Sequence, residues 1–358
     1  MDRYLHIIQE EISTVKKDDL YAEIKSTSLN SLDLLMIRGA LERHFNFVIP
    51  DEVWYSQSTL EESLQYFHNN CDLEKIGTKK VLDKISISDT VEIRMPQMAN
   101  EELSESWLLK YLGDFHWNLI TRGFEKQSSS FVDADGNRLY STFVRINYEL
   151  TALKDFGENE VISFGGKIDA FGKSAIRSEI YGESNQNKLQ ANLLTVFSVK
   201  SESVNVIDKA RLDGLESKIP QLNKTDSFIS DYNLVKKEFR ETLETKFGNF
   251  PLSNSEVIFE KIYQLNPFAD INGVGLLYFA SYPMISDFCL LSYPGIDDFS
   301  SYSTVYRDIF YFGNCNRNDK IIFKLNFIDR NDEGLRLVTS LYRLSDNVLI
   351  AKIITVKK

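Results

Sequence analysis

The spacing of hydrophobic residues divides this chain of 358 residues into two unlike parts. Within residues 1–70 the apolar side chains recur at helical spacing; in "SLDLLMIRGALERHF", for example, Leu34, Ile37 and Leu41 share one stripe. From about residue 89 onward, short runs rich in β-branched and aromatic residues replace this pattern and predict strands. The sequence therefore predicts a helical N-terminal domain followed by a larger domain that is dominated by β-structure.

Two local signals indicate helix boundaries in the N-terminal part. Pro50 disfavours helical backbone at the residue before it, so "IPDEVW" is expected to interrupt the helical pattern. Ser58 and Glu61 have the spacing of a capping box, and we expect a short helix after them.

The larger part repeats one layout twice. In its first half the helical run "LSESWLLKYLGDFHWNLITRGF" precedes several β-rich runs. In its second half a strand, "SEVIFEKIYQL", leads into "NGVGLLYFASYPMISDF", which is apolar nearly all round and therefore typical of a buried helix. A helix followed by consecutive strands, occurring twice, is the outline of a tandem (double) hotdog, in which antiparallel sheets each wrap round a central helix.

The segment "DADGN" (133–137) separates two of the β-rich runs and carries two aspartates. A calcium loop of the EF-hand type needs a longer set of spaced ligands, so we interpret this segment as a hairpin turn. The sequence contains no His/Cys cluster with metal-ligand spacing, and no metal site is predicted.

Charge and composition narrow the class of protein. The net charge of −11 argues against a nucleic-acid partner. Residues 1–72 hold 13 Asp/Glu and 6 Lys/Arg, so most of the acidic excess lies there, and the shift suggests a boundary near residues 72–88. No apolar run is long enough to span a membrane, and "MDRYLHIIQEEI" lacks the pattern of a signal peptide. Three cysteines without CxxC spacing fit reduced thiols, so we expect a cytoplasmic protein.

Residues 26–62 resemble an acyl carrier protein. The elements that carry the resemblance follow one another in the family's order: Asn30-Ser31-Leu32-Asp33, Leu41-Glu42-x-x-Phe45, Ile49-Pro50-Asp51-Glu52 and Thr59. The resemblance implies that Ser31 carries 4′-phosphopantetheine, installed by a phosphopantetheinyl transferase. A hydroxyl at a helix N-terminus lies in a positive field that suits a phosphodiester. The alternative is that Ser31 only begins a helix.

The carrier-like segment departs from the family's pattern at three positions. Asn30 replaces the usual aspartate, which keeps a helix-capping side chain but removes a charge. Arg38 and Arg43 stand where carriers are usually acidic. We expect these changes to alter recognition by the transferase or by partner enzymes.

Together these patterns predict an α+β protein: an N-terminal four-helix acyl carrier bundle followed by a tandem (double) hotdog. The expected divisions are residues 1–72 for the carrier domain, 73–88 for a linker, 89–235 for the first hotdog and 236–358 for the second.

Several residues are candidates for thioester chemistry. Asp270, Asn272 and Gly273 precede the second predicted helix and resemble, in loosened form, a thioesterase helix-start pattern, Asp-x-x-Gly-x-x-Asn. Glycine there would let backbone N–H groups approach a thioester oxyanion. Asp270 has the alternative role of capping the helix. His116 is the one histidine beyond residue 70 and is kept as a candidate acid or base, although a packed helix histidine is the commoner case.

Four segments together resemble the acyltransferase/decarboxylase family of polyketide biosynthesis, whose named member acts in the leinamycin pathway. They are "MPQMANEELSESWLLKYLGDFHW", "DADGNRLYSTFVRINY", "NPFADINGVGLLYFASYPMISD" and "STVYRDIFYFGN", spread over residues 90–358. The resemblance implies a double hotdog that converts methylmalonyl-CoA, a coenzyme A thioester, to a propionyl thioester on a carrier protein. It also implies a catalytic tyrosine, for which Tyr140 is the best match and Tyr148 a weaker one, and polyketide synthase or carrier partners.

Two other functions stay open at this stage. The hotdog could be a thioesterase or a simple acyltransferase that acts on the fused carrier, and Asp270 favours this reading. Alternatively, it could be a docking module without catalytic activity. Release of free acid from a thioester would indicate the first. Pathway flux that stays intact in both Tyr140→Phe and Asn272→Ala would indicate the second.

Overall fold

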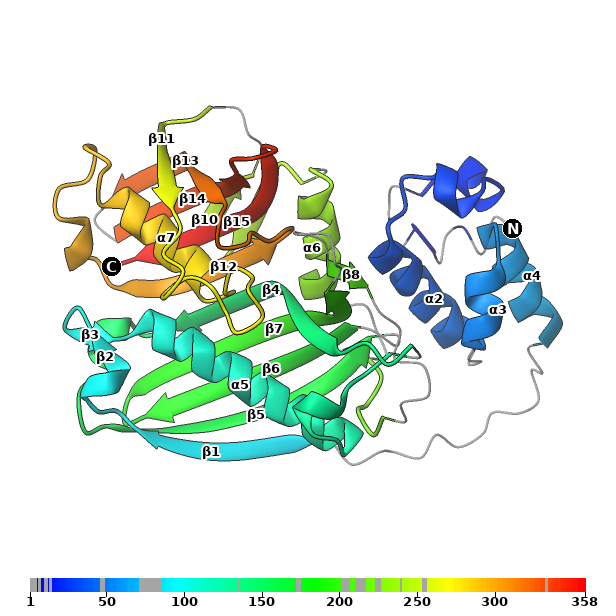
Figure 1. Ribbon diagram of the computed structural model, residues 1–358, viewed down its shortest axis with the longest axis horizontal. Helices are drawn as coiled ribbons and strands as arrows, with labels where there is room; N and C mark the ends of the chain where they lie inside the picture. Colours follow the sequence, from blue (N-terminus) through cyan, green and yellow to red (C-terminus); the bar gives the residue numbers. More distant parts are fainter. Residues whose placement is uncertain are drawn as a thin grey trace.

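The structure is a computed structural model, and its largest element is one continuous antiparallel sheet (Figure 1). It describes residues 5, 8–9, 12, 15–45, 49–70, 85–133, 135–171, 175–200, 207–209, 217–222, 227–238, 240–252, 256–331 and 334–358.

Eleven strands form the sheet, and their order has a near two-fold symmetry. The order is β1-β5-β6-β7-β4 in the first half and β12-β15-β14-β13-β11 in the second, with β8 paired to β7. The second half repeats the first in reverse, so β4 and β12 meet at the centre. The strands are β1 (Ser86–Glu92), β4 (Leu139–Leu150), β5 (Val161–Phe171), β6 (Ala175–Ser184), β7 (Asn187–Lys200), β8 (Ile207–Lys209), β11 (Phe259–Gln264), β12 (Thr304–Tyr311), β13 (Lys320–Asn331), β14 (Gly334–Arg343) and β15 (Val348–Lys357).

One long helix lies against the sheet in each half (Figure 1). Helix α5 (Glu105–Phe124) begins after Ser104, whose Oγ accepts a hydrogen bond from the Trp107 N–H, and α7 (Ser281–Leu290) covers the second half. The two helices and the facing side chains of the sheet share one apolar core. The described residues therefore form the α+β hotdog architecture that the repeated layout predicted: a long antiparallel sheet with central helices.

Smaller elements complete the larger part. Helix α6 (Ser227–Lys236) packs on the opposite face of the sheet from α5 and α7. Two short hairpins pair β2 (Met98–Ala99) with β3 (Glu102–Leu103) and β9 (Thr242–Thr245) with β10 (Gly248–Pro251). The 3₁₀ turns are η1 (Lys17–Leu20), η2 (Ile24–Ser26), η3 (Met95–Gln97), η4 (Ser128–Ser130), η5 (Leu153–Asp155) and η6 (Phe299–Ser301).

The structure differs from two of the expected elements in this part. The helix predicted from "NGVGLLYFASYPMISDF" begins only at Ser281, because residues 270–278 turn back on themselves instead. Strand β6 was not among the predicted runs, since its apolar residues alternate with Arg, Ser and Glu. The "DADGN" turn is confirmed: Val132 and Arg138 bridge across it, and Gly136 has a φ of +83°.

The N-terminal part consists of short helices, and the residues described there do not form a clear four-helix bundle, as the carrier resemblance had implied. They contain α2 (Ser31–Phe45), α3 (Asp51–Ser56) and α4 (Leu60–Asn70) beside η1 and η2. Membrane spans are not found among the described helices, none of which is long and apolar enough.

Capping differs in detail from the sequence prediction. Asn30 caps α2: its Oδ1 accepts from the Asp33 N–H, and Asp33 Oδ2 accepts from the Asn30 N–H. The box before α4 is shifted by one residue from the predicted pair, because Thr59 Oγ1 accepts from the Glu62 N–H and Glu62 reaches back to the Thr59 N–H.

Arg38 also has a different place from the one expected. Its side chain is buried, donates to the Ile49 carbonyl and pairs with Glu42 at 2.7 Å. It therefore joins α2 to Ile49, and an exposed position for partner recognition is wrong for this arginine. The side chain of Arg43 lies outside the described residues.

A buried ion pair joins the two halves of the sheet. Arg145 of β4 and Asp308 of β12 form a bidentate pair, with Nε–Oδ1 at 2.9 Å and Nη2–Oδ2 at 2.6 Å. The guanidinium lies between the rings of Phe228 and Phe310, at 4.4 and 4.5 Å from their centroids. Because both charges are almost fully buried, each depends on the other for compensation.

We predict that Asp308→Asn lowers the free energy of unfolding by about 3–5 kcal/mol, because it removes the bidentate partner of the buried Arg145 guanidinium and leaves only the Asp231 carboxylate, 3.7 Å away. Urea unfolding followed by circular dichroism measures this loss. Glu183→Gln is the matched control, since Glu183 pairs with Lys188 at the exposed surface and should change stability little. Similar small effects for both variants would contradict the prediction.

Candidate active site

The two hotdogs are joined by a short ladder that separates at each end. β4 and β12 pair from Arg145↔Phe310 to Glu149↔Tyr306. The register of β4 against β7 shifts between Phe143 and Arg145, and that of β12 against β15 shifts between Thr304 and Tyr306, so each strand bends where the ladder ends. We call the two ends the open fork, between residues 139–144 and 311–314, and the filled fork, between residues 300–305 and 150–156.

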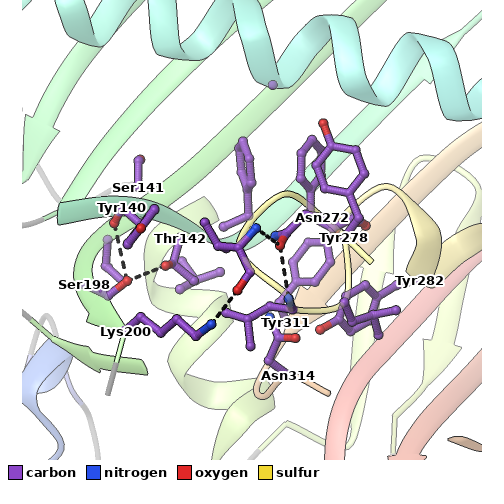
Figure 2. Close-up of a pocket in the computed structure, with 18 of the residues that line it drawn as sticks. Tyr140, Ser141, Thr142, Ser198, Lys200, Asn272, Tyr278, Tyr282, Tyr311 and Asn314 are labelled. Atoms are coloured by element: carbon purple, nitrogen blue, oxygen red, sulfur yellow. Dashed lines mark hydrogen bonds between the residues drawn. The ribbon is translucent and has the colours of Figure 1, made fainter. Parts of the chain in front are cut away.

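The open fork holds a cavity of about 760 Å³, within the range of small-molecule sites. Helix α5, the start of β4, the end of β7, the segment after β12 and one side of α6 form its walls, as Figure 2 shows in part. Phe143 and Phe279 pack at 4.3 Å between ring centroids along it. Gly113 of α5 permits this approach, because a Cβ there would lie 2.6 Å from the Phe279 ring.

A tight hairpin, residues 270–278, enters the open fork. Ile271 and Leu277 bridge across it, and Gly275 makes the turn with a φ of +81°. The Leu277 N–H donates to the Cys315 carbonyl at 2.7 Å, which ties the hairpin to the segment after β12. The cavity is therefore built from both hotdogs.

The hairpin presents hydrogen-bond donors to the cavity. Asn272 Oδ1 accepts from the backbone N–H groups of Val274 and Leu276, at 3.0 and 3.1 Å, so its Nδ2 group is left to donate. The backbone N–H of Gly273 makes no hydrogen bond within the part of the chain that the structure describes. Both residues line the cavity, and two such donors can stabilise an oxyanion.

Tyr140 lines the same cavity from β4 (Figure 2). Its carbonyl accepts from Ser198 Oγ at 3.3 Å, and the guanidinium of Arg138 lies 5.2 Å from its ring centroid. The structure thus brings together three of the predicted site residues, Tyr140, Asn272 and Gly273; their catalytic roles stay predictions.

Charged side chains lie around the cavity that the sequence alone did not single out. Lys110 and Asp114 are exposed on α5, Lys200 donates to the Val274 carbonyl, and Lys236 belongs to α6. No sequence motif marks them, because isolated lysines and aspartates are ordinary surface residues. They are recognised as cavity residues only in the structure, where α5, α6 and β7 meet at the open fork.

Asp270 does not line the cavity. Its side chain is buried, and Oδ2 accepts from the Tyr263 hydroxyl at 2.9 Å and from the Asn266 N–H at 2.7 Å. Since α7 begins eleven residues later, at Ser281, Asp270 does not cap that helix either. Its position favours a role in holding the base of the hairpin.

His116 is fully buried on α5 and also lies outside the cavity lining. Its ring nitrogens contact Ser178 Oγ at 2.7 Å and Thr195 Oγ1 at 2.8 Å. Burial lowers the pKa of His116 to about 3. A neutral imidazole that joins α5 to β6 and β7 fits a packing role better than an acid–base role.

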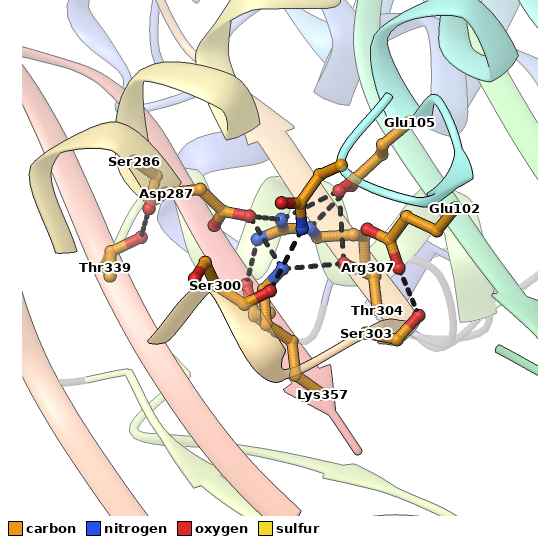
Figure 3. A network of polar contacts seen from close by, with 12 residues as sticks. Glu102, Glu105, Ser286, Asp287, Ser300, Ser303, Thr304, Arg307, Thr339 and Lys357 are labelled. Carbon is orange, nitrogen blue, oxygen red and sulfur yellow. Dashed lines mark hydrogen bonds and ion pairs between the residues drawn. The ribbon is translucent and has the colours of Figure 1, made fainter. Parts of the chain in front are cut away.

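A dense charge network occupies the filled fork (Figure 3). Arg307 pairs with Glu105 at 2.7 Å and with Asp287 at 2.6 Å, and Lys357 pairs with Asp287 at 2.8 Å. Although burial favours the protonated acid, Arg307 and Lys357 hold the pKa of Asp287 below its ordinary value. The Tyr148 hydroxyl donates to Glu105 and is buried here, so the alternative catalytic tyrosine lies away from the cavity.

Ser31 begins α2, as the carrier resemblance requires, but its side chain lies outside the described residues. The structure therefore shows that a helix begins at Ser31, and the attachment of 4′-phosphopantetheine stays a prediction.

Comparison with known proteins shows the fold. The chain is similar to the 12:0-ACP thioesterase from Umbellularia californica, with a TM-score of 0.54 and 10% identity over 76% of this chain and 97% of that one. An acyl-ACP thioesterase from Bacteroides thetaiotaomicron (TM-score 0.51, 11% identity, 76% and 98% covered) and a putative oleoyl thioesterase from Lactobacillus plantarum (0.51, 11%, 77% and 97%) are also similar. No known family model matches the sequence, and no curated protein matches it.

At these identities the likeness shows the double hotdog alone. The covered share corresponds in length to the residues from β1 to the C-terminus.

We predict that His116 makes the protein less stable as the pH falls. The pKa is about 3 in the folded chain and near 6.5 when unfolded, so between these values only the unfolded chain takes up the proton. The free energy of unfolding should fall by about 1.4 kcal/mol per pH unit below about pH 6.5 from this group. Urea unfolding at several pH values, with His116→Asn for comparison, isolates the effect; equal slopes for both proteins would show that His116 is charged in the fold.

Proposed function

We propose that this protein is an enzyme that acts on acyl thioesters, with the thioester held in the open fork. One observation carries the proposal. A single cavity of the double hotdog combines an apolar wall with two hydrogen-bond donors that are not already engaged, the Gly273 N–H and Asn272 Nδ2. The similar solved structures support it, because their names describe thioesterases that act on acyl groups.

The first candidate reaction is cleavage of the thioester. The carbonyl oxygen would accept from Gly273 and Asn272, so attack at the carbonyl carbon moves charge onto an oxygen that already faces fixed donors. The C–S bond then breaks, and the thiol leaves with a proton. Asp114 is the carboxylate that lines the cavity and could accept a proton from an attacking water. With a thiol as the nucleophile, the same steps give acyl transfer.

The second candidate is decarboxylation of a malonyl-type thioester before transfer, as the acyltransferase/decarboxylase resemblance implies. The observation that favours it is that Tyr140, with Arg138 against its ring, lines the same cavity as Lys110 and Lys200. These side chains offer cations for a substrate carboxylate and a phenol for proton transfer. The bond from the α-carbon to the carboxylate breaks, CO2 leaves, and its electron pair forms an enolate held by the same donors. Tyr140 then gives a proton to the α-carbon and regains one from solvent.

We further propose that Ser31 carries 4′-phosphopantetheine, so that residues 26–62 act as an acyl carrier. The four carrier-like elements and the capped start of α2 support this. The arm would supply a thiol that bears or receives the acyl group.

The test is to incubate the purified chain with a series of acyl-CoA thioesters and with methylmalonyl-CoA, and to identify the products by mass spectrometry. Free acid with free CoA supports cleavage, and propionyl thioester supports decarboxylation. If every thioester stays intact, the enzymatic proposal is wrong and a docking module is the better description.

We predict that Asn272→Asp lowers kcat for either reaction by about 10²–10³, because it removes the Nδ2 donor and keeps the Oδ1 acceptor that holds the hairpin. Tyr140→Phe should lower the rate of decarboxylation by about 10²–10⁴ and leave cleavage nearly unchanged. Steady-state kinetics measure both effects. Tyr181→Phe, an exposed tyrosine on β6, is the control. Unchanged kinetics in Asn272→Asp would contradict this arrangement.

A further inference from the structure

The start of α2 is held against the end of α6. Asp33 is fully buried, and its Oδ2 lies 2.6 Å from Lys237 Nζ. Asn233 Nδ2 donates to Met36 Sδ at 2.7 Å one turn away along both helices. Figure 1 shows α2 beside α6. The ion pair and the polar contact join the two helices at the same place, although Asp33 Oδ1, Asn233 Oδ1 and Lys237 Nζ are buried there without a hydrogen bond.

Apolar packing extends this interface beyond the polar contacts. Leu35, Ile37 and Leu41 of α2 belong to the same hydrophobic cluster as residues of α6 and of the outer face of the sheet. The carrier-like segment is therefore packed on the double hotdog through a shared core.

Helix α6 also forms one wall of the open fork. Tyr232 and Lys236 line the cavity, and the Tyr232 hydroxyl donates to the Tyr311 carbonyl at 3.0 Å. Burial lowers the pKa of Lys236, and the nearby Asp33 carboxylate opposes this shift. Lys236 thus lies between the first turn of α2 and the cavity.

We propose that α6 docks residues 26–62 so that an acyl arm on Ser31 enters the open fork of the same chain, with Lys236 binding the phosphate of the arm. This inference rests on the proposed function and adds the route by which the substrate arrives. Ser31 stands two residues before Asp33, at the end of α2 that faces α6. An ammonium group beside a helix N-terminus matches a phosphodiester in charge.

Docking in cis has a kinetic consequence. An arm held at the cavity mouth reaches the site at a high effective concentration, whereas a separate carrier must first bind. Lys237 and Lys236 have distinct tasks in this arrangement: the Lys237–Asp33 pair holds the segment, and Lys236 guides the arm.

The arm itself gives a readout that does not depend on turnover. Treating the chain with a phosphopantetheinyl transferase and CoA forms a bond from Ser31 Oγ to the phosphorus of the pantetheine phosphate. The phosphoanhydride bond of CoA breaks, and adenosine bisphosphate leaves. Intact mass measures the gain, and peptide mapping then follows alkylation of the arm thiol by iodoacetamide.

We expect the arm thiol of the holo chain to react several-fold more slowly than free pantetheine. Lys237→Glu and the milder Lys237→Gln should remove most of this protection, and Lys236→Ala should remove part of it. The two Lys237 variants should still turn over acyl-CoA added in solution. Lys218→Glu is the matched control, since Lys218 pairs with Glu125 at the exposed surface and should keep full protection.

The possible failures are distinct. A thiol that reacts as fast as free pantetheine in the unaltered holo chain, or equal protection in all variants, would overturn the docking proposal while acyl-CoA turnover persists. No mass gain at Ser31 would overturn it as well. Absence of turnover with every acyl-CoA, by contrast, would overturn the proposed function itself.

Discussion

The short ladder between β4 and β12 is the constraint on which the rest of the molecule depends. It turns two hotdog sheets into one, and both of its faces carry a buried arginine–carboxylate pair, Arg145–Asp308 on one side and Arg307–Glu105 on the other. Buried ion pairs add less to stability than their distances suggest, but they are intolerant of a wrong register. The ladder therefore fixes how the hotdogs meet, and with it the shape of both forks.

The two forks occupy equivalent positions in the sheet topology, but one contains a cavity and the other is filled by side chains. In one, a hairpin with Asn272 and Gly273 leaves a cavity. In the other, Arg307, Asp287 and Lys357 fill the corresponding space with mutually compensated charge. A site needs donors that are not already engaged, whereas the filled fork has its polar groups paired with each other. The duplicated fold thus has a cavity at one end of the β4–β12 ladder and a buried charge network at the other.

The sequence predicted the larger elements well, because a helix or strand that is buried on one face has hydrophobic residues at a regular spacing. The repeated order of helix and strands can be predicted from the sequence. Tyr140, Asn272 and Gly273 were also identified there, and they line one cavity in the structure. The hairpin at 270–278 was mistaken for a helix because its apolar residues are buried in a fork rather than along one helix face. The sequence could not identify Lys110, Lys200 and Lys236 as cavity residues, since only the tertiary structure brings them to the same cavity.

Residues whose chemistry suggested catalysis were the least predictable. Asp270 and His116 are reactive types in suggestive positions, yet each is engaged by neighbours from other elements, Tyr263 in one case and Ser178 with Thr195 in the other. Local sequence does not contain the partners of His116, which lie 62 and 79 residues away along the chain. Arg38 is a similar case in the N-terminal part, because a residue expected at the surface is buried in the structure.

The inequality of the forks has a consequence for stoichiometry. Within the described part of the chain, one fork is open and its counterpart is closed by charge, and the chain carries one carrier-like segment beside the open one. Many assemblies with repeated sites must coordinate several substrates. Here the duplicated fold carries one open fork within the described residues, so the proposed reaction would take one acyl group per chain.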